Sequence, residues 1–326
     1  MPTYQIVRDE ELCVGCGLCE AFCPVDVFEE CAKGEMPPIV NPEACWGCET
    51  CSGQCPKGAL TVTCVGGEDP FESREKAQPL DSDRRAELVQ WAETLKSILE
   101  LENEPVAVTL VRAGAPLPDV PLPKERLRFC QALMRARKGD SYLMPANRHS
   151  CPDGTSILGL TDVPAKLASG ELYILFHKLD NIEAARQMVA ERPHLEPHSM
   201  DATLVTPLSK PVAEPDVIVV VATPEQVMWL NMATSYYTGH RHDFKASGYN
   251  AQCVEATLIP YITQRTNISF GCYGCRAAND VGPEMMSLGI PPALMPDILK
   301  GLRELGKKAI PQSRAKIYLH EGAEQL

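Results

Sequence analysis

Two cysteine runs, Cys13-x2-Cys16-x2-Cys19-x3-Cys23-Pro24 and Cys45-x2-Cys48-x2-Cys51-x3-Cys55-Pro56, decide how the first part of this chain folds. Thiolates three residues apart in a loop can converge on three corners of an iron–sulfur cube. The fourth cysteine of each run lies on the following helical segment, too far round to close the same cube. In a two-cluster arrangement it binds the partner cluster instead. The two runs therefore predict two [4Fe–4S] clusters.

The spacing predicts which cysteines share a cluster. We assign one cluster to Cys13, Cys16, Cys19 and Cys55, and the other to Cys45, Cys48, Cys51 and Cys23. Glycines 15, 17 and 47 allow backbone amides to approach the inorganic sulfides, and the prolines after each run hold the turn. A structural zinc site is the alternative. Zinc favours two Cys-x2-Cys pairs, not runs of three followed by a fourth cysteine and a proline.

On these motifs, residues 1–65 resemble a bacterial-type ferredoxin with two [4Fe–4S] clusters. The resemblance implies an α+β fold, a pseudo-symmetric pair of hairpins with two short helices, that transfers single electrons at low potential. The stretch 29–40 is slightly long for that family and carries an additional Cys31. Cys31 and Cys64 have no place in the motif, and we interpret both as free thiols.

A boundary follows this head. Residues 66–82 are predicted to be a linker, because Gly66-Gly67-Glu68-Asp69-Pro70 and the polar run to Pro79 lack apolar periodicity. The remaining residues, 83–326, form the body. Its first helix is expected at about 83–102, where apolar residues recur at helical spacing after the capping side chains of Asp81, Ser82 and Asp83.

The body has the pattern of an α/β domain. Strand-like composition occurs at 106–111, 172–177, 217–221 and 316–320. Helical spacing occurs between them, at about 127–138, 181–190, 224–236, 250–263 and 293–305. The predicted fold is therefore an α+β ferredoxin-like head followed by a larger α/β domain.

A weak internal repeat suggests two pseudo-symmetric halves in the body. Glu104-Pro105 and Glu214-Pro215 each precede an apolar strand, and each strand is followed by a cysteine on a helical segment and another in a glycine-bearing loop. If the halves pack about a two-fold axis, Cys130, Cys151, Cys253 and Cys272 could meet there and hold a third iron–sulfur cluster, with Cys275 competing for the place of Cys272. Alternatively these cysteines are buried, inert thiols.

Residues of about 85–326 resemble the domain of unknown function 169 family. The resemblance is carried by Arg128-Phe129-Cys130-Gln131-Ala132, Cys151 with Gly154, Pro215-Asp216-Val217 with Pro224-Glu225-Gln226, Cys253, and Gly271-Cys272-Tyr273-Gly274-Cys275-Arg276. It implies kinship with uncharacterised proteins of anaerobic bacteria and archaea, and it names no reaction.

Two further side chains are candidates for catalysis. His149, two residues before Cys151, could hydrogen-bond a cluster sulfur or deliver a proton; otherwise it is a solvated loop histidine. Arg276 could hold an anionic substrate or offset the charge of a cluster, and a surface salt bridge is the simpler account. No nucleotide-binding glycine motif and no Gly-x-Ser-x-Gly occurs, so nucleotide cofactors and serine hydrolysis are poorly supported.

The composition of the chain indicates which cellular compartment and which classes of partner to expect. The net charge of −12 argues against nucleic acid and anionic membranes. The longest apolar run, 217–222, is too short to cross a bilayer, and the N-terminus lacks an export signal. We therefore expect a cytoplasmic protein whose fifteen cysteines bind metal rather than pair as disulfides.

The favoured hypothesis is an oxidoreductase that passes single electrons through both clusters to a cysteine-ligated centre in the body. Residues 1–80 contain 14 acidic and 5 basic side chains. A redox partner with a basic face is therefore expected to dock there in a salt-sensitive way. A small-molecule substrate and a homo-oligomer remain open. The alternative is a non-catalytic adaptor or iron–sulfur carrier that docks a ferredoxin onto a larger redox complex.

Overall fold

The computed structural model describes residues 3–67, 71–278 and 281–308, so the predicted strand at 316–320 lies outside the described residues. The chain divides into two compact units. The first comprises residues 1–79, 109–135 and 141–205, and the second comprises residues 80–108, 136–140 and 206–326. No helix in the described ranges has both the length and the apolar composition needed to cross a membrane.

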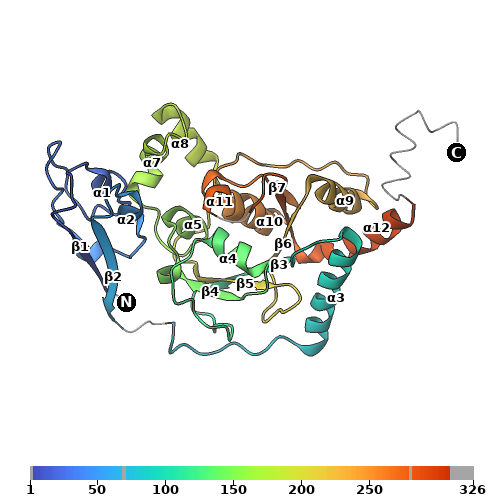
Figure 1. Ribbon diagram of the computed structural model, residues 1–326. Helices are drawn as coiled ribbons and strands as arrows, with labels where there is room; N and C mark the ends of the chain where they lie inside the picture. The colour runs from blue at the N-terminus through green and yellow to red at the C-terminus, as the bar shows by residue number, and fades with distance from the viewer. Residues whose placement is uncertain (1–2, 68–70, 279–280, 309–326) are drawn as a thin grey trace. The chain divides into compact units, whose positions relative to one another are not determined.

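The head is a small two-stranded structure within the first unit. Strands β1 (Thr3–Arg8) and β2 (Leu60–Gly66) pair antiparallel, with Ile6 opposite Val62. Between them lie α1 (Leu18–Ala21), the 3-10 turn η1 (Pro42–Ala44) and α2 (Thr50–Gln54). The two helices contact each other (Figure 1). The two short helices that the ferredoxin resemblance implies are thus present.

The segment after the head is attached to the body at its far end. Leu117 donates its amide to Glu75 O and accepts from Ala77 N, each at 2.8 Å, and Arg74 forms a 2.7 Å ion pair with Asp201. Residues 74–77 therefore do not form a free tether, although the described residues 71–79 contain no helix or strand.

A six-stranded sheet has the order β4-β5-β3-β6-β8-β7. Its strands are β3 (Val106–Arg112), β4 (Tyr142–Pro145), β5 (Met200–Pro207), β6 (Val217–Ala222), β7 (Asn267–Ser269) and β8 (Met286–Ile290). The pairs β4–β5, β3–β6, β6–β8 and β7–β8 are antiparallel. The prediction of an α/β body is therefore corrected to α+β, because an α/β fold is built on parallel strands joined by crossover helices.

The strand order repeats about the middle of the sheet. Strands β3 and β6 lie side by side in the centre, β5 and β8 flank them, and β4 and β7 form the edges. Along the chain, β3, β4 and β5 come in the same order as β6, β7 and β8, each set with a helix after its first strand.

Helices precede, connect and follow the strands of the six-stranded sheet. They are α3 (Ser82–Leu99), α4 (Phe129–Ala136), η2 (Ala146–Arg148), α5 (Pro152–Ile157), α6 (Ala165–Ala168), α7 (Glu171–Leu175), α8 (Ile182–Glu191), α9 (Pro224–Ser235), the π-helix η3 (Ala251–Leu258), α10 (Ile259–Thr263), α11 (Tyr273–Ala278), η4 (Pro292–Leu294) and α12 (Met295–Lys308). Asp81 caps α3 by accepting from the amides of Asp83 and Arg84, as its sequence position predicts.

Most predicted elements of the body are confirmed, and one is wrong. Helices α3, α4, α8, α9 and α12 and strands β3 and β6 occur where the pattern places them. The segment predicted as a strand at 172–177 instead contains the helix α7. A short apolar run does not distinguish a strand from a buried helix turn. Here Leu172 and Tyr173 become buried on one side of that turn.

The second unit has a large apolar core of its own. Most of its fully buried side chains come from α3, β6, α9, β8 and α12, among them Leu88, Leu95, Ile218, Leu230 and Met295. Each of these side chains is completely screened from water. Burial on this scale stabilises the unit without any cofactor, at about 1.5–3 kcal/mol for each large aliphatic side chain.

Candidate functional site

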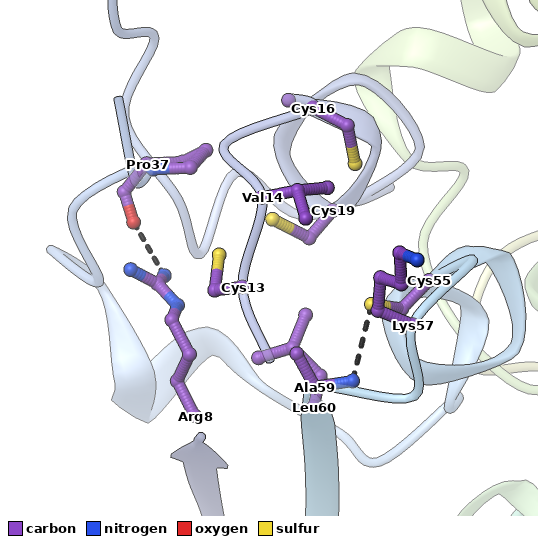
Figure 2. Close-up of a pocket in the computed structure, with 11 residues that line it drawn as sticks. Arg8, Cys13, Val14, Cys16, Cys19, Pro37, Cys55, Lys57, Ala59 and Leu60 are labelled. Atoms are coloured by element: carbon purple, nitrogen blue, oxygen red, sulfur yellow. Dashed lines mark hydrogen bonds between the residues drawn. The ribbon is translucent and has the colours of Figure 1, made fainter. Parts of the chain in front are cut away.

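The head contains a cavity lined by one complete set of four cysteines. Figure 2 shows the sulfur atoms of Cys13, Cys16, Cys19 and Cys55 around it. Cys13 and Cys16 come from the loop that leads into α1, Cys19 lies on that helix, and Cys55 follows α2. Arg8 and Lys57 also line the cavity, together with small and apolar side chains.

A second cavity in the head is lined by the other four cysteines of the two runs. Cys45 and Cys48 come from the loop that leads into α2, Cys51 lies on that helix, and Cys23 follows α1. The remaining lining is largely apolar and comprises Ile6, Pro24, Val25, Val27, Phe28, Trp46, Glu49 and Val62. The structure thus brings together the eight cysteines in the two groups of four that the spacing predicts.

The two loops have equivalent backbones. Gly15 and Gly47 both adopt left-handed conformations, with φ of 62° and 73°. The residue before each helix, Gly17 or Glu49, is left-handed as well. These reversals turn three successive thiols toward one space, and the glycines adopt them without the strain that a β-carbon adds.

The fourth cysteine of each run is held by an amide four residues later. Val27 N donates to Cys23 Sγ at 3.4 Å, and Ala59 N donates to Cys55 Sγ at 3.3 Å. Such hydrogen bonds stabilise a sulfur that carries negative charge. In iron–sulfur proteins they also contribute to the reduction potential.

The thiols of the second cavity resist ionisation on their own. Burial, reinforced by the neighbouring Cys48, Cys23 and Cys45, raises the pKa of Cys51 to about 12. Burial also raises the pKa of Cys23 and Cys45. A cationic metal group would take the place of these protons, since metal binding deprotonates thiol ligands.

These residues fit two [4Fe–4S] groups better than a mononuclear ion. Among the described residues, no three His, Cys, Asp or Glu side chains lie close enough to hold a single metal ion. Thiolates around a four-iron cube are farther apart than the ligands of one ion. The all-sulfur donor set and the apolar walls of the cavities suit such a cube.

In the body, two of the five predicted ligands belong to the first unit. Cys130 begins α4, and Cys151 is the N-cap of α5, where it accepts from Gly154 N at 3.4 Å. Burial and the negative charge of Asp153 raise the pKa of Cys151 to about 12, and a charge on Cys130 would contribute in the same direction. Cys130 and Cys151 are therefore near enough to interact electrostatically.

The other three predicted ligands belong to the second unit. Cys253 lies on the π-helix and donates to Asn250 O at 3.5 Å. Cys272 precedes α11, and Cys275 is fully buried on that helix. None of the fifteen cysteines, all within the described ranges, forms a disulfide. A third cluster that draws on both units stays a prediction.

The two candidate catalytic side chains have defined partners. His149 is buried rather than solvated, with Nε2 3.1 Å from Met144 O and 3.2 Å from Thr203 Oγ1. Burial lowers the pKa of His149 to about 3, so the ring is neutral. Arg276 donates to three carbonyls, those of Phe270, Gly282 and Met285, at 2.6–2.9 Å. These contacts assign Arg276 a structural role in the loop around Cys272.

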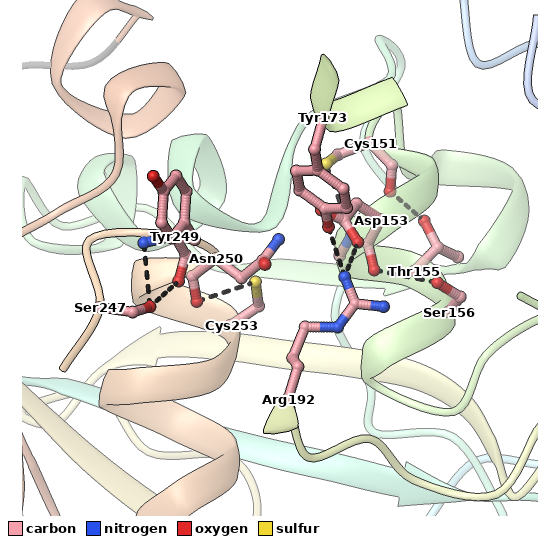
Figure 3. Close-up of polar contacts among 11 residues, drawn as sticks. Cys151, Asp153, Thr155, Ser156, Tyr173, Arg192, Ser247, Tyr249, Asn250 and Cys253 are labelled. Carbon is pink, nitrogen blue, oxygen red and sulfur yellow. Dashed lines mark hydrogen bonds and ion pairs between the residues drawn. The ribbon is translucent and has the colours of Figure 1, made fainter. Parts of the chain in front are cut away.

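A buried polar cluster beside Cys151 was not predicted from the sequence. Arg192 donates to Asp153 Oδ1 and to the hydroxyl of Tyr173, and that hydroxyl donates to Asp153 Oδ2 at 2.7 Å (Figure 3). Arg192 and Asp153 are each only 8% exposed. The position of Asp153, two residues after Cys151, was the one sequence signal that could have pointed to this cluster. Its partners, Tyr173 and Arg192, lie much further along the chain.

The second unit contains another buried carboxylate, Glu255, on the π-helix. It accepts from Gly248 N and from the hydroxyls of Ser247 and Ser269, at 2.8–3.2 Å. Only 2% of Glu255 is exposed. It therefore ties the loop before the helix and strand β7 to the turn that carries Cys253.

Comparisons with known proteins give one family match for the body of the chain and another for its head. A family model described as "DUF169: Uncharacterised ArCR" matches residues 94–301, and one described as "4Fe-4S binding domain" matches residues 6–29 and 38–61. "Uncharacterized protein MJ0308" of Methanocaldococcus jannaschii is 28% identical over 219 residues, which cover 66% of this chain and 94% of that protein. No solved structure matches the chain.

Proposed function

Because the chain belongs to the DUF169 family and carries two 4Fe–4S binding motifs ahead of that domain, we propose that it is an iron–sulfur oxidoreductase. In this proposal its head supplies single electrons to a centre in the body. The observation that carries the proposal is the pair of four-cysteine cavities in the head. When bound, [4Fe–4S] groups supply reversible one-electron transfer.

The residues of the head have separate tasks. Cys13, Cys16, Cys19 and Cys55 hold one cluster, and Cys45, Cys48, Cys51 and Cys23 hold the other. The amides of Val27 and Ala59 stabilise the sulfurs of the two cysteines that follow the helices. The largely apolar walls of the second cavity limit the access of water to the group held there. The acidic side chains of the head attract a redox partner with a basic face.

In the body, we assign a third centre to Cys130, Cys151, Cys253 and either Cys272 or Cys275. The repeated strand order of the sheet supports two pseudo-symmetric halves that each contribute two ligands. The π-helix under Cys253 also supports the assignment, because π-helical turns occur frequently at functional sites. A centre with one open iron position would admit a small-molecule substrate.

The buried cluster beside Cys151 would serve that centre. The hydroxyl of Tyr173 lies between the Asp153 carboxylate and the Arg192 guanidinium, so it holds a proton at one fixed place. The guanidinium compensates the negative charge of the carboxylate in an environment with little water. His149 stays neutral at physiological pH and orders the loop before Cys151 through Met144 O.

Anaerobic iron and sulfide analysis of the full chain tests the proposal. A third cubane raises the iron content from about eight to about twelve atoms per chain. The double variant Cys151→Ser/Cys272→Ser should lose about four irons, while the low-temperature electron spin resonance of the head is retained. The variant Cys31→Ser is the matched control, because that thiol lies outside both cavities.

Two outcomes would contradict parts of the proposal. An iron content of about eight atoms that the double variant leaves unchanged would remove the third centre. It would favour the alternative of an adaptor that docks a ferredoxin onto a larger enzyme. A protein made without air that contains zinc or no iron in its head would refute the electron-transfer role itself.

A further inference from the structure

The two cysteine loops of the head have equivalent backbones but different surroundings. In the first loop, Val14 is 54% exposed and Cys16 is exposed as well. In the second, Trp46 occupies the position of Val14 and is partly buried. Its carbonyl accepts a hydrogen bond from Arg126, which belongs to the DUF169 part of the chain.

Arg126 connects the second loop to the body within the first unit. Its Nη1 donates to Trp46 O and, at 2.9 Å, to the hydroxyl of Tyr4, and its Nη2 donates to His149 O. One guanidinium therefore joins the Cys45–Cys48 loop to a residue two positions before Cys151. The planar guanidinium suits this task because its donors point in several fixed directions.

Gly47 shows how closely this contact is packed. A β-carbon there would lie 2.4 Å from the Tyr4 ring and 2.7 Å from Arg126 Nη1. At Gly15, the equivalent glycine, a β-carbon would instead meet the backbone of Gly34, inside the head. The first loop is thus covered by the head itself, and the second is covered partly by the body.

Lys166 makes a second connection between the body and the head. Its ammonium group donates to Glu20 O at 2.8 Å and to Glu20 Oε1 at 3.0 Å, and it pairs with Asp26 at 3.3 Å. Phe22 belongs to a buried apolar cluster with Leu167, and its ring lies 4.6 Å from the ring of Phe176.

Both cations contact segments next to cysteines of the second set. Arg126 donates to the carbonyl of Trp46, which lies between Cys45 and Cys48, and Lys166 pairs with Asp26, three residues after Cys23. The basic side chains that line the cavity of the other set, Arg8 and Lys57, belong to the head. The body therefore adds positive charge beside one set of cysteines.

We propose that the set Cys23, Cys45, Cys48 and Cys51 forms the body-side end of the electron route, held there by Arg126 and Lys166. This inference rests on the proposed function. Accepting one electron adds one negative charge to the group that these cysteines hold, with no bond made or broken and no proton transferred. The electron comes from a one-electron carrier protein, which is oxidised by one electron. The two cations stabilise the added charge, so they favour electron flow toward the body.

Redox titration of the full chain, followed by low-temperature electron spin resonance, tests the inference. The variants Arg126→Gln and Lys166→Gln should each lower the reduction potential of one and the same centre. We expect about a tenfold loss in the equilibrium constant for reduction in the double variant, which is ~59 mV for one electron. The matched control Arg8→Gln, at the other cavity, should shift the other centre.

The outcomes separate this inference from the proposed function. If two iron–sulfur centres are present but Arg126→Gln and Lys166→Gln move neither potential, or move the same one as Arg8→Gln, the inference is overturned and the proposed function stands. If Arg126→Gln does not bind iron, Arg126→Lys decides. It keeps the charge, so the potential should stay near that of the unaltered chain, and a fall equal to that of Lys166→Gln would overturn the inference.

Discussion

The head and the second unit are stabilised in different ways. The core of the head is formed by Cys19, Cys23 and Cys51 with a few apolar side chains, among them Val27 and Phe28. The second unit instead buries a continuous set of aliphatic and aromatic side chains around α3, β6, α9 and α12. A small domain whose core is made of metal ligands depends on its metal to fold. The second unit has enough apolar burial to fold without one.

Removing iron should therefore have the largest effect, and it should unfold the head while the core of the second unit stays folded. Chelation under anaerobic conditions leaves buried thiols without a cation, so we expect strands β1 and β2 to lose their protection. Hydrogen exchange measures this loss residue by residue. The amides of β6 and β8 should remain protected in the same sample. Retained protection of β1 after complete iron removal would show that the head folds on its own.

Replacing one ligand should have the next largest effect. Cys51→Ser and Cys19→Ser each remove a buried thiol from a different set. We expect each variant to lose about four irons per chain, which metal analysis and electron spin resonance can measure. Cys64→Ser is the control, because Cys64 is exposed and lines neither cavity. Loss of all iron in either variant would show that the two sets do not load independently.

Breaking the buried ion pair should destabilise the chain without affecting the cysteine sets of the head. Arg192→Met leaves the Asp153 carboxylate buried without its cation, and such a loss costs about 3–5 kcal/mol. Denaturant unfolding of the iron-loaded chain measures the change. Arg186→Met, at an exposed position of α8, the helix that Arg192 follows as C-cap, should stay within about 0.5 kcal/mol. Equal effects from both variants would contradict a special role for the buried pair.

The smallest predicted effect concerns pH. Burial lowers the pKa of His242, whose Nε2 lies 2.7 Å from Ser235 Oγ. The unfolded chain therefore binds a proton at this residue at a higher pH than the folded chain does. Stability is lost as the pH falls below the ordinary histidine pKa of about 6.5. His242→Asn should flatten the pH dependence of unfolding below about pH 6.5. An unaltered pH dependence of unfolding in His242→Asn would contradict this prediction.

Sequence patterns predicted the longer elements of the body and missed the shorter ones. Helices such as α3 and α9 are long enough to show a full apolar period, and Thr223 and Gln226 form a capping box at α9. Strands β4, β5, β7 and β8 were missed. Strand β7 has only three residues, and β5 is buried along almost its whole length, so it shows no alternation of apolar and polar residues.

By itself, the sequence determined the two cysteine sets, because the ligands of each run are local and their spacing limits which cluster each thiol can reach. Only the tertiary structure decided what surrounds them. Arg126 and Lys166 lie 80 and 146 residues from their partners Trp46 and Glu20, and Arg192 lies 39 residues from Asp153. Contacts over such distances depend on how the chain packs, and no local pattern of residues encodes them.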